Sequence, residues 1–301
     1  MSHHKSLTLS VSILLLLGFI WGSGYVIARY VEQHGMPVLD YTFWQTLGPG
    51  VLSVLYLLFR GATWSALKKY WQYFLVTAVL GIVIPNTNMY AMANRMPSNI
   101  LAIVINISPL IIYPLALLFH LEKFWWVRFF SVLLGLFGIM LVVLPHSNFL
   151  TSHFTSWILL ALITPFSFAL CAIYITRFRP PDVDSVMLSA GMLLFATVIL
   201  LPFVLSYQPQ KLWIPINFVG SLVLLRIILA AIGYILLFTL LKLAGPVYYS
   251  LVDGVVILTG IFWGWVVFGE KLNGWLISAI VLIIFAILIM SWSSYKQKAI
   301  E

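Results

Sequence analysis

Residues 100–118 read ILAIVINISPLIIYPLALL, nineteen residues without a charged side chain. A transmembrane α-helix needs about 20 predominantly apolar residues to cross the hydrocarbon core of a bilayer. A transmembrane β-strand would instead alternate apolar and polar residues over about ten positions, and this stretch has no such alternation. The segment therefore predicts a membrane-spanning helix.

The rest of the chain has the same character. Hydrophobic residues make up 62% of its 301 residues and charged residues 8%, whereas soluble domains carry roughly 25% charged residues. The polar residues form short clusters between apolar runs, which is typical of loops between membrane spans. These observations exclude a soluble globular domain and predict an all-α integral membrane protein.

Ten apolar runs are long enough to be transmembrane helices. They lie near residues 10–31, 38–59, 72–93, 99–120, 125–144, 156–176, 185–205, 218–242, 247–268 and 273–292. The segments between and beyond them are expected outside the bilayer: a periplasmic loop at 146–155 and two cytoplasmic ends at 1–9 and 293–301.

The distribution of basic residues predicts the orientation, because Lys and Arg in short loops are retained on the cytoplasmic side. With the N-terminus in the cytoplasm, only Arg95, Lys211 and Lys271 fall outside. The basic residues on the cytoplasmic side are then Lys5, Arg60, Lys68, Lys69, Lys123, Arg128, Arg177, Arg179, Lys242, Lys296 and Lys298. We expect both termini to be cytoplasmic in a bacterial inner membrane. The net charge of +8 is therefore a topology signal and does not indicate a nucleic-acid partner.

The two halves of the chain superimpose after a shift of 148 residues. Glu122-Lys123 falls on Glu270-Lys271, and Arg29 falls on Arg177. The sequence therefore predicts two repeats, 10–145 and 156–292, each with five helices. Because five is odd, the second repeat enters the membrane from the opposite side, which suits alternating access.

Arg226 and Asp253 lie inside predicted spans, where each charge costs roughly 2.5–3.5 kcal/mol on insertion scales. Counted from the span centres, they are separated by roughly 12 Å in depth. One interpretation is that they line a cavity, where Arg226 binds a carboxylate and Asp253 binds an amine or a proton. The alternatives are that Arg226 extends to the outer interface and that Asp253 caps or hydrogen-bonds a neighbouring helix.

Asparagines cluster in the third and fourth spans, at Asn86, Asn88 and Asn106. Pro85 precedes Asn86, and Ser108-Pro109 follows Asn106, so we expect freed backbone carbonyls at the depth of these amides. Buried amides in a membrane bind substrate or join neighbouring helices. Asn86 and Asn106 are candidates for the cavity, and interhelical contact is the alternative.

Four aromatic residues lie deeper than the interfacial belt: Trp21, Trp44, Tyr90 and Tyr234. They are candidates for an apolar or cation–π lining around an amine or an aromatic ring. Packing and lipid contact are the alternative roles. Gly18 and Gly22, four residues apart, predict a close approach between two helices.

The chain resembles the EamA family of the drug/metabolite transporter superfamily. The resemblance rests on Trp21-Gly22-Ser23-Gly24, Ser108-Pro109, Leu121-Glu122-Lys123, Gly135-Leu136-Phe137-Gly138 and the second ending Phe268-Gly269-Glu270-Lys271. It implies a ten-helix carrier with a central cavity surrounded by helices 1–4 and 6–9, with helices 5 and 10 peripheral. It also implies a structural role for Glu122 and Glu270. Gln45 replaces an arginine that the family often has, and Ile257 replaces a proline.

These observations favour a secondary transporter that exports amino acids or related amines. Uptake of such metabolites, a membrane scaffold and a membrane enzyme are the alternatives. We expect no catalytic residues, no metal site and no cofactor, because the chain lacks the usual enzyme and phosphate-binding motifs. Its expected partners are a small-molecule substrate and the lipid bilayer, and the sequence is compatible with a monomer.

Overall fold

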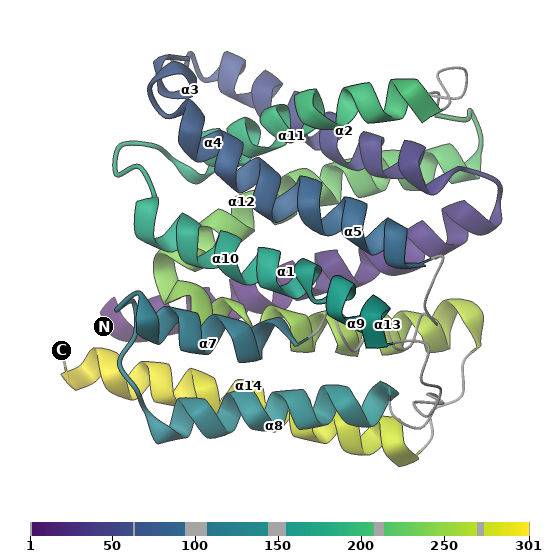
Figure 1. Cartoon of the computed structure of the whole chain (residues 1–301). Helices are drawn as coiled ribbons and strands as arrows, with labels where there is room; N and C mark the ends of the chain where they lie inside the picture. The colour runs from purple at the N-terminus through teal and green to yellow at the C-terminus, as the bar shows by residue number, and fades with distance from the viewer. Residues whose placement is uncertain are drawn as a thin grey trace.

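The computed structural model describes residues 2–62, 64–93, 107–143, 155–207, 214–269 and 274–300. Every regular element in these residues is a helix, and the helices form one bundle with both termini at the same end (Figure 1). The all-α architecture expected from the apolar runs is therefore present throughout the described part of the chain.

The first half forms eight helical elements. They are α1 (Ser2–Gln33), α2 (Val38–Phe59), α3 (Ser65–Lys69), α4 (Trp71–Ala78), the π-helical turn η1 (Val79–Val83), α5 (Ile84–Ala93), α7 (Ser108–Leu118) and α8 (Trp126–Val143). The second half forms α9 (Thr155–Ala161), α10 (Ile163–Phe178), α11 (Ser185–Tyr207), α12 (Phe218–Tyr249), α13 (Val252–Phe268) and α14 (Gly274–Ile300).

Five helical segments among the described residues are long and apolar enough to cross a membrane. They are Thr8–Gln33, Asp40–Phe59, Leu159–Phe178, Ser185–Ser206 and Phe218–Tyr249. Four further apolar helices are shorter: Ser108–Leu118, Trp126–Gly138, Val252–Val267 and Ile277–Met290. The chain is thus a multi-pass membrane protein, and helix length alone does not confirm the expected ten spans.

The contacts between helices follow the 148-residue shift. Helix α1 packs on α13, and its counterpart α10 packs on α7. Helices α2 and α11 correspond to each other and are in contact, as are α8 and α14. The last pair lies side by side at one edge of the bundle and runs in opposite directions (Figure 1). This is the contact pattern of a pseudo-two-fold axis between the halves.

Two predicted spans are less regular than expected, and in both a proline follows the irregularity. The span 72–93 contains η1 just before Pro85, and the span 156–176 is interrupted at Leu162, three residues before Pro165. Proline has no backbone N–H, so each ring leaves a carbonyl one turn earlier without its helical donor. Hydrophobic periodicity does not reveal such local breaks.

The amide of Asn88 compensates for the break at Pro165. Its Nδ2 donates to the carbonyl oxygens of Leu160 and Ala161 at 3.1 and 3.5 Å, and to the hydroxyl of Thr164 at 2.9 Å. In return the hydroxyl of Ser167 donates to the carbonyl of Leu80 at 2.7 Å. The freed carbonyl expected before Pro85 is therefore present and accepts from Ser167. The break at Pro165 adds carbonyls that the sequence does not predict, and those expected before Ser108-Pro109 lie outside the described residues.

The boundary between the predicted spans 218–242 and 247–268 also differs. Helix α12 continues to Tyr249 across a kink at Gly245, whose φ is 78°. Glycine adopts this backbone conformation at little cost because it has no Cβ. The helical backbone then breaks at Ser250-Leu251 before α13 begins. Pro246 supplies the physical reason for the kink, since it cannot donate to the carbonyl one turn earlier.

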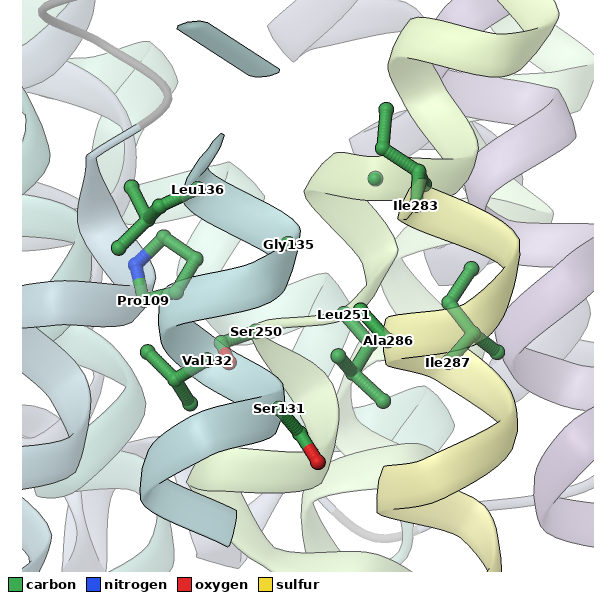
Figure 2. Close-up of a pocket in the computed structure, with 11 residues that line it drawn as sticks. Pro109, Ser131, Val132, Gly135, Leu136, Ser250, Leu251, Ile283, Ala286 and Ile287 are labelled. Carbon is green, nitrogen blue, oxygen red and sulfur yellow. The ribbon is translucent and has the colours of Figure 1, made fainter. Parts of the chain in front are cut away.

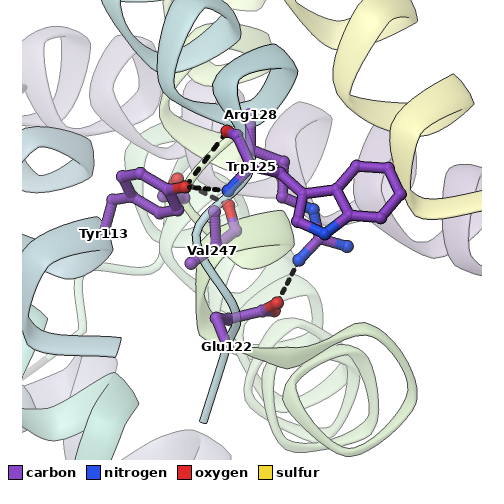
Figure 3. A network of polar contacts seen from close by, with 6 residues as sticks. Tyr113, Glu122, Trp125, Arg128 and Val247 are labelled. Carbon is purple, nitrogen blue, oxygen red and sulfur yellow. Dashed lines mark hydrogen bonds and ion pairs between the residues drawn. The ribbon is translucent and has the colours of Figure 1, made fainter. Parts of the chain in front are cut away.

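A buried ion pair lies against this kink. Arg128 at the start of α8 donates to the Glu122 carboxylate, and both side chains are nearly enclosed, with exposed fractions of 7% and 11% (Figure 3). A Cβ at Gly245 would lie 3.3 Å from Glu122 Oε1. The structural role implied for Glu122 agrees with this position, whereas Glu270 lies outside the described residues.

Tyr113 holds the start of α8 beside this pair. Its hydroxyl donates to the carbonyl of Trp125 at 3.2 Å and accepts from the backbone N–H of Trp125 at 3.1 Å (Figure 3). The connection between α7 and α8 is thus held by both the ion pair and the tyrosine.

We predict that Arg128→Met lowers the stability of the detergent-solubilised protein, because it leaves the Glu122 carboxylate buried without a counter-charge. Breaking one side of a buried pair costs about 3–5 kcal/mol. Thermal unfolding followed by intrinsic fluorescence measures the loss. The double variant Glu122→Gln with Arg128→Met should recover most of it, and equal destabilisation of the single and double variants would contradict the role of the pair.

Candidate functional site

Arg226 of α12 is enclosed by α1 and α2, and only 8% of it is exposed. Its Nη1 donates to the carbonyl oxygen of Ile20 at 3.0 Å, and its guanidinium carbon lies 5.1 Å from the ring centroid of Trp21. The hydroxyl oxygen of Tyr41 at the start of α2 accepts a further hydrogen bond. None of these partners in the described part of the chain is a carboxylate.

Glycine at position 24 makes room for the guanidinium. A Cβ there would overlap Cζ, Nη2 and Nε of Arg226. The carbonyl of Gly24 also accepts a hydrogen bond from the Tyr41 hydroxyl at 3.5 Å. The bare backbone of α1, one edge of α2 and the Arg226 side chain therefore meet in one small polar region inside an apolar bundle.

Aromatic rings line this region. The rings of Trp21 and Tyr234 meet edge to face, with centroids 5.0 Å apart. Trp44 packs against the buried cluster that contains Tyr41 and Ile227. Three of the four aromatic candidates from the sequence thus lie around Arg226, while the fourth, Tyr90, belongs to α5.

Asp253 lies elsewhere, in the first turn of α13. Its carboxyl group is hydrogen-bonded by the hydroxyl of Ser108, the first residue of α7. The N-termini of two helices therefore meet at this carboxyl group, and their backbone dipoles favour a negative charge there.

Helix α1 gives the separation between the two charged residues. A Cβ at Gly18 would contact Val255 and the carbonyl of Val252, which flank Asp253, whereas Gly24 contacts Arg226. Gly18 and Gly24 are six residues apart, which corresponds to about 9 Å along the axis of α1. Arg226 and Asp253 thus occupy two sites along one helix, consistent with the separation in depth expected from the sequence.

The asparagines do not join either site in the described structure. Asn86 of α5 is partly exposed, and the amide of Asn88 joins α5 to the break between α9 and α10. Asn106 lies outside the described residues. The interhelical role that the sequence left open thus fits Asn88.

A small pocket lies beside the start of α13, where Leu251 and Gly254 line it. It has a volume of about 20 Å³, enough for one water molecule, and lies between the α12–α13 break and the paired helices α8 and α14 (Figure 2). Its lining includes Ser250 and Gly254 beside the break, Pro109 of α7, Gly135 of α8 and Ala286 of α14. Small side chains thus leave free space behind the break.

The loops at the end of the bundle that holds the termini contact one another across the two halves. Lys69 donates to Asp182 at 3.1 Å, and the Tyr70 hydroxyl donates to the same carboxylate at 3.0 Å. These hydrogen bonds hold the pKa of Asp182 below its usual value, the larger effect coming from Lys69. Arg60 lies 4.0 Å from Asp184.

Comparison with known proteins assigns the family. The sequence profile of the EamA-like transporter family matches residues 8–144 and 155–292. The chain belongs to this family. The two matches coincide with the two halves related by the 148-residue shift, so this EamA-like transporter contains two copies of the family's repeat.

Two relatives extend over nearly the whole chain. An uncharacterized transporter of Bacillus subtilis, YvbV, is 24% identical over 295 residues, which cover 97% of this chain and 94% of YvbV. A crystal structure with 15% sequence identity superimposes with a TM-score of 0.77 and covers 94% of this chain and 98% of that one. The second likeness shows the fold alone.

Two polar residues of these sites were not singled out from the sequence of this EamA-like transporter. Tyr41 touches Arg226, and Ser108 binds Asp253. Tyr41 gave no signal of its own because it lies at a predicted span end, where tyrosine is common. The sequence marks Ser108 only as part of a helix break.

We predict that Gly24→Ala displaces the Arg226 guanidinium and weakens substrate binding while the protein remains folded. Gly260→Ala is the matched control, since a Cβ at Gly260 would meet no atom within 4 Å. Both changes exchange a helical glycine for alanine, so their effects on helix propensity are similar. Binding isotherms and thermal midpoints of both variants measure the difference, and equal binding by the two would refute the prediction.

Proposed function

We propose that this EamA-like transporter is a secondary carrier that exports amino acids or related amines by alternating access. The observation that carries this proposal is the Arg226 site. A guanidinium enclosed in an apolar bundle, without a carboxylate partner among the described residues, is suited to bind an anionic group. The aromatic rings of Trp21, Trp44 and Tyr234 supply the apolar surface that a substrate side chain needs.

The proposed topology has ten spans in two inverted repeats, in a bacterial inner membrane with cytoplasmic termini. Three observations support it: both termini lie at one end of the bundle, α8 and α14 run in opposite directions, and the contacts follow the 148-residue shift. In such a carrier the two repeats exchange conformations around a central site.

Asp253 is the proposed proton-coupling residue. Its carboxyl group lies in the bundle interior close to the α12–α13 break and is hydrogen-bonded by Ser108. Protonation removes the charge that the two helix N-termini stabilise, and so changes the interaction between α7 and α13. This is a local change through which a proton gradient can bias the two conformations.

Uptake is the second candidate direction of transport, since one binding site can serve either export or uptake. Exchange assays in liposomes separate the carrier from a scaffold or an enzyme. We expect the purified protein in proteoliposomes to exchange radiolabelled amino acids from a panel. Loss of exchange across the whole panel and across other small metabolites would overturn the proposal.

We predict that Arg226→Gln lowers exchange at least tenfold, because the substrate carboxylate loses its charged partner. Charge-assisted hydrogen bonds contribute about 1.5–3 kcal/mol, which corresponds to roughly 10- to 150-fold in affinity. Arg177→Gln is the matched control, because Arg177 is exposed at the end of α10. Initial exchange rates at equal reconstitution measure both, and a similar rate for the two variants would exclude Arg226 from substrate binding.

We predict that Asp253→Asn removes the response of transport to an imposed pH gradient and leaves equilibrium substrate binding within about threefold of wild type, since Arg226 lies in a separate site. Glu32→Gln, at an exposed carboxylate near the end of α1, is the control. Gradient-driven and gradient-free fluxes are compared in the same vesicles. An undiminished pH response in Asp253→Asn would rule out the proton site.

A further inference from the structure

Helix α2 carries several buried polar side-chain atoms that find no hydrogen-bond partner among the described residues, and three of them belong to two adjacent residues: Trp44 Nε1, Gln45 Nε2 and Gln45 Oε1. Burying polar groups without partners costs free energy, so each such group in a folded protein requires an explanation. The two residues are adjacent, and together they offer two kinds of donor and one acceptor.

The position of these atoms on α2 places them beside Arg226. Tyr41 binds the guanidinium, and a Cβ at Gly48 would overlap the side chain of Ile227, the residue after Arg226. Gln45 lies one turn after Tyr41 and one turn before Gly48, so the three share a helix face. Gly50, on the opposite face, approaches Leu193 of α11 instead. Gln45 therefore faces the region that contains Arg226.

This face of α2 and Arg226 together offer a hydrogen-bond acceptor as well as donors, whereas a simple anion site offers donors alone. Arg226 and the indole N–H of Trp44 can only donate hydrogen bonds, which suits a carboxylate. Gln45 Oε1 can only accept, which suits an ammonium group. The two groups of an α-amino acid are attached to one carbon atom, so they must be bound within a few ångströms of each other.

Helix spacing favours Gln45 over Asp253 as the residue that binds such an amino group together with Arg226. Along α1 the two charged residues are separated by about 9 Å, whereas Gln45 is one turn, about 6 Å, from the tyrosine that touches the guanidinium. Gln45 thus lies one helix turn from the residue that touches the guanidinium, whereas the Asp253 carboxyl group is hydrogen-bonded by Ser108 of α7.

We propose that Gln45 recognises the amino group of the substrate while Arg226 and Trp44 bind its carboxylate, so that the carrier selects α-amino acids over carboxylates that lack the amino group. This inference rests on the proposed function, in which Arg226 binds the transported molecule. It assigns Gln45 as a specificity-determining residue and reserves Asp253 for the proton.

The test compares pairs of competitors that differ only in the amino group. L-Leucine is paired with 4-methylpentanoate and L-phenylalanine with 3-phenylpropionate, each competing against a radiolabelled amino acid that the wild-type carrier exchanges. Sites that hydrogen-bond a substrate N–H discriminate strongly against analogues without it. We expect the wild type to prefer the amino acid of a pair by about tenfold or more, and Gln45→Met to reduce this preference to about threefold or less.

Gln72→Met is the matched control, because Gln72 is an exposed glutamine on α4, and it should keep the wild-type preference. If the wild type exchanges no amino acid, the proposed function fails. If the wild type exchanges amino acids and Gln45→Met keeps the same preference as Gln72→Met, the Gln45 inference alone is overturned.

Gln45→Glu gives a second test that does not depend on the stability of Gln45→Met. The new carboxylate would lie beside Arg226 and compete with the carboxylate of the substrate, so exchange should fall at least tenfold at an unchanged thermal midpoint. Wild-type exchange by this variant would overturn the placement of Gln45 at the site.

Discussion

The close approach of other helices to α1 is the constraint on which both candidate sites depend. Gly18 and Gly22 face α13, where a Cβ would overlap Val255 and Thr259, while Gly24 faces the guanidinium of Arg226. Without side chains at these three positions, α1 contacts α13 along one face and leaves room for a charged side chain along another. A single helix thereby holds Arg226 and the helix that carries Asp253 in fixed relation.

Breaks in the helices place main-chain polar groups inside the bundle, and the structure satisfies them from neighbouring helices. Asn88 donates to the carbonyls before Pro165, and Ser167 donates to the carbonyl of Leu80. At the break between α12 and α13 the nearest acidic side chain is Asp253, which Ser108 hydrogen-bonds. The break before Pro165 therefore joins two neighbouring helices. The break between α12 and α13 is followed by an acidic side chain inside the bundle.

Much of this architecture follows from the sequence, because apolar runs and the 148-residue shift are properties of whole segments. The helical class and the two repeats could be predicted. The sequence predicts that Arg226 and Asp253 lie at different depths, but it does not show which side chains touch each of them. The breaks at Leu162 and Ser250-Leu251 could not, since they depend on which neighbouring side chain satisfies a freed carbonyl. The sequence marks Gln45 only as a departure from the family pattern, because the number of hydrogen-bond partners of its side chain depends on how α2 packs against α12.

The two ion-pair sites at the end of the bundle that holds the termini differ in their response to dissolved salt. The Debye length is about 8 Å at physiological ionic strength, so mobile ions screen exposed charges but reach enclosed ones much less. Lys69 and Asp182 are exposed and connect the two repeats, whereas Glu122 and Arg128 are enclosed within the first repeat. A rising salt concentration therefore weakens the ion pair between the repeats and has much less effect on the ion pair inside the first repeat.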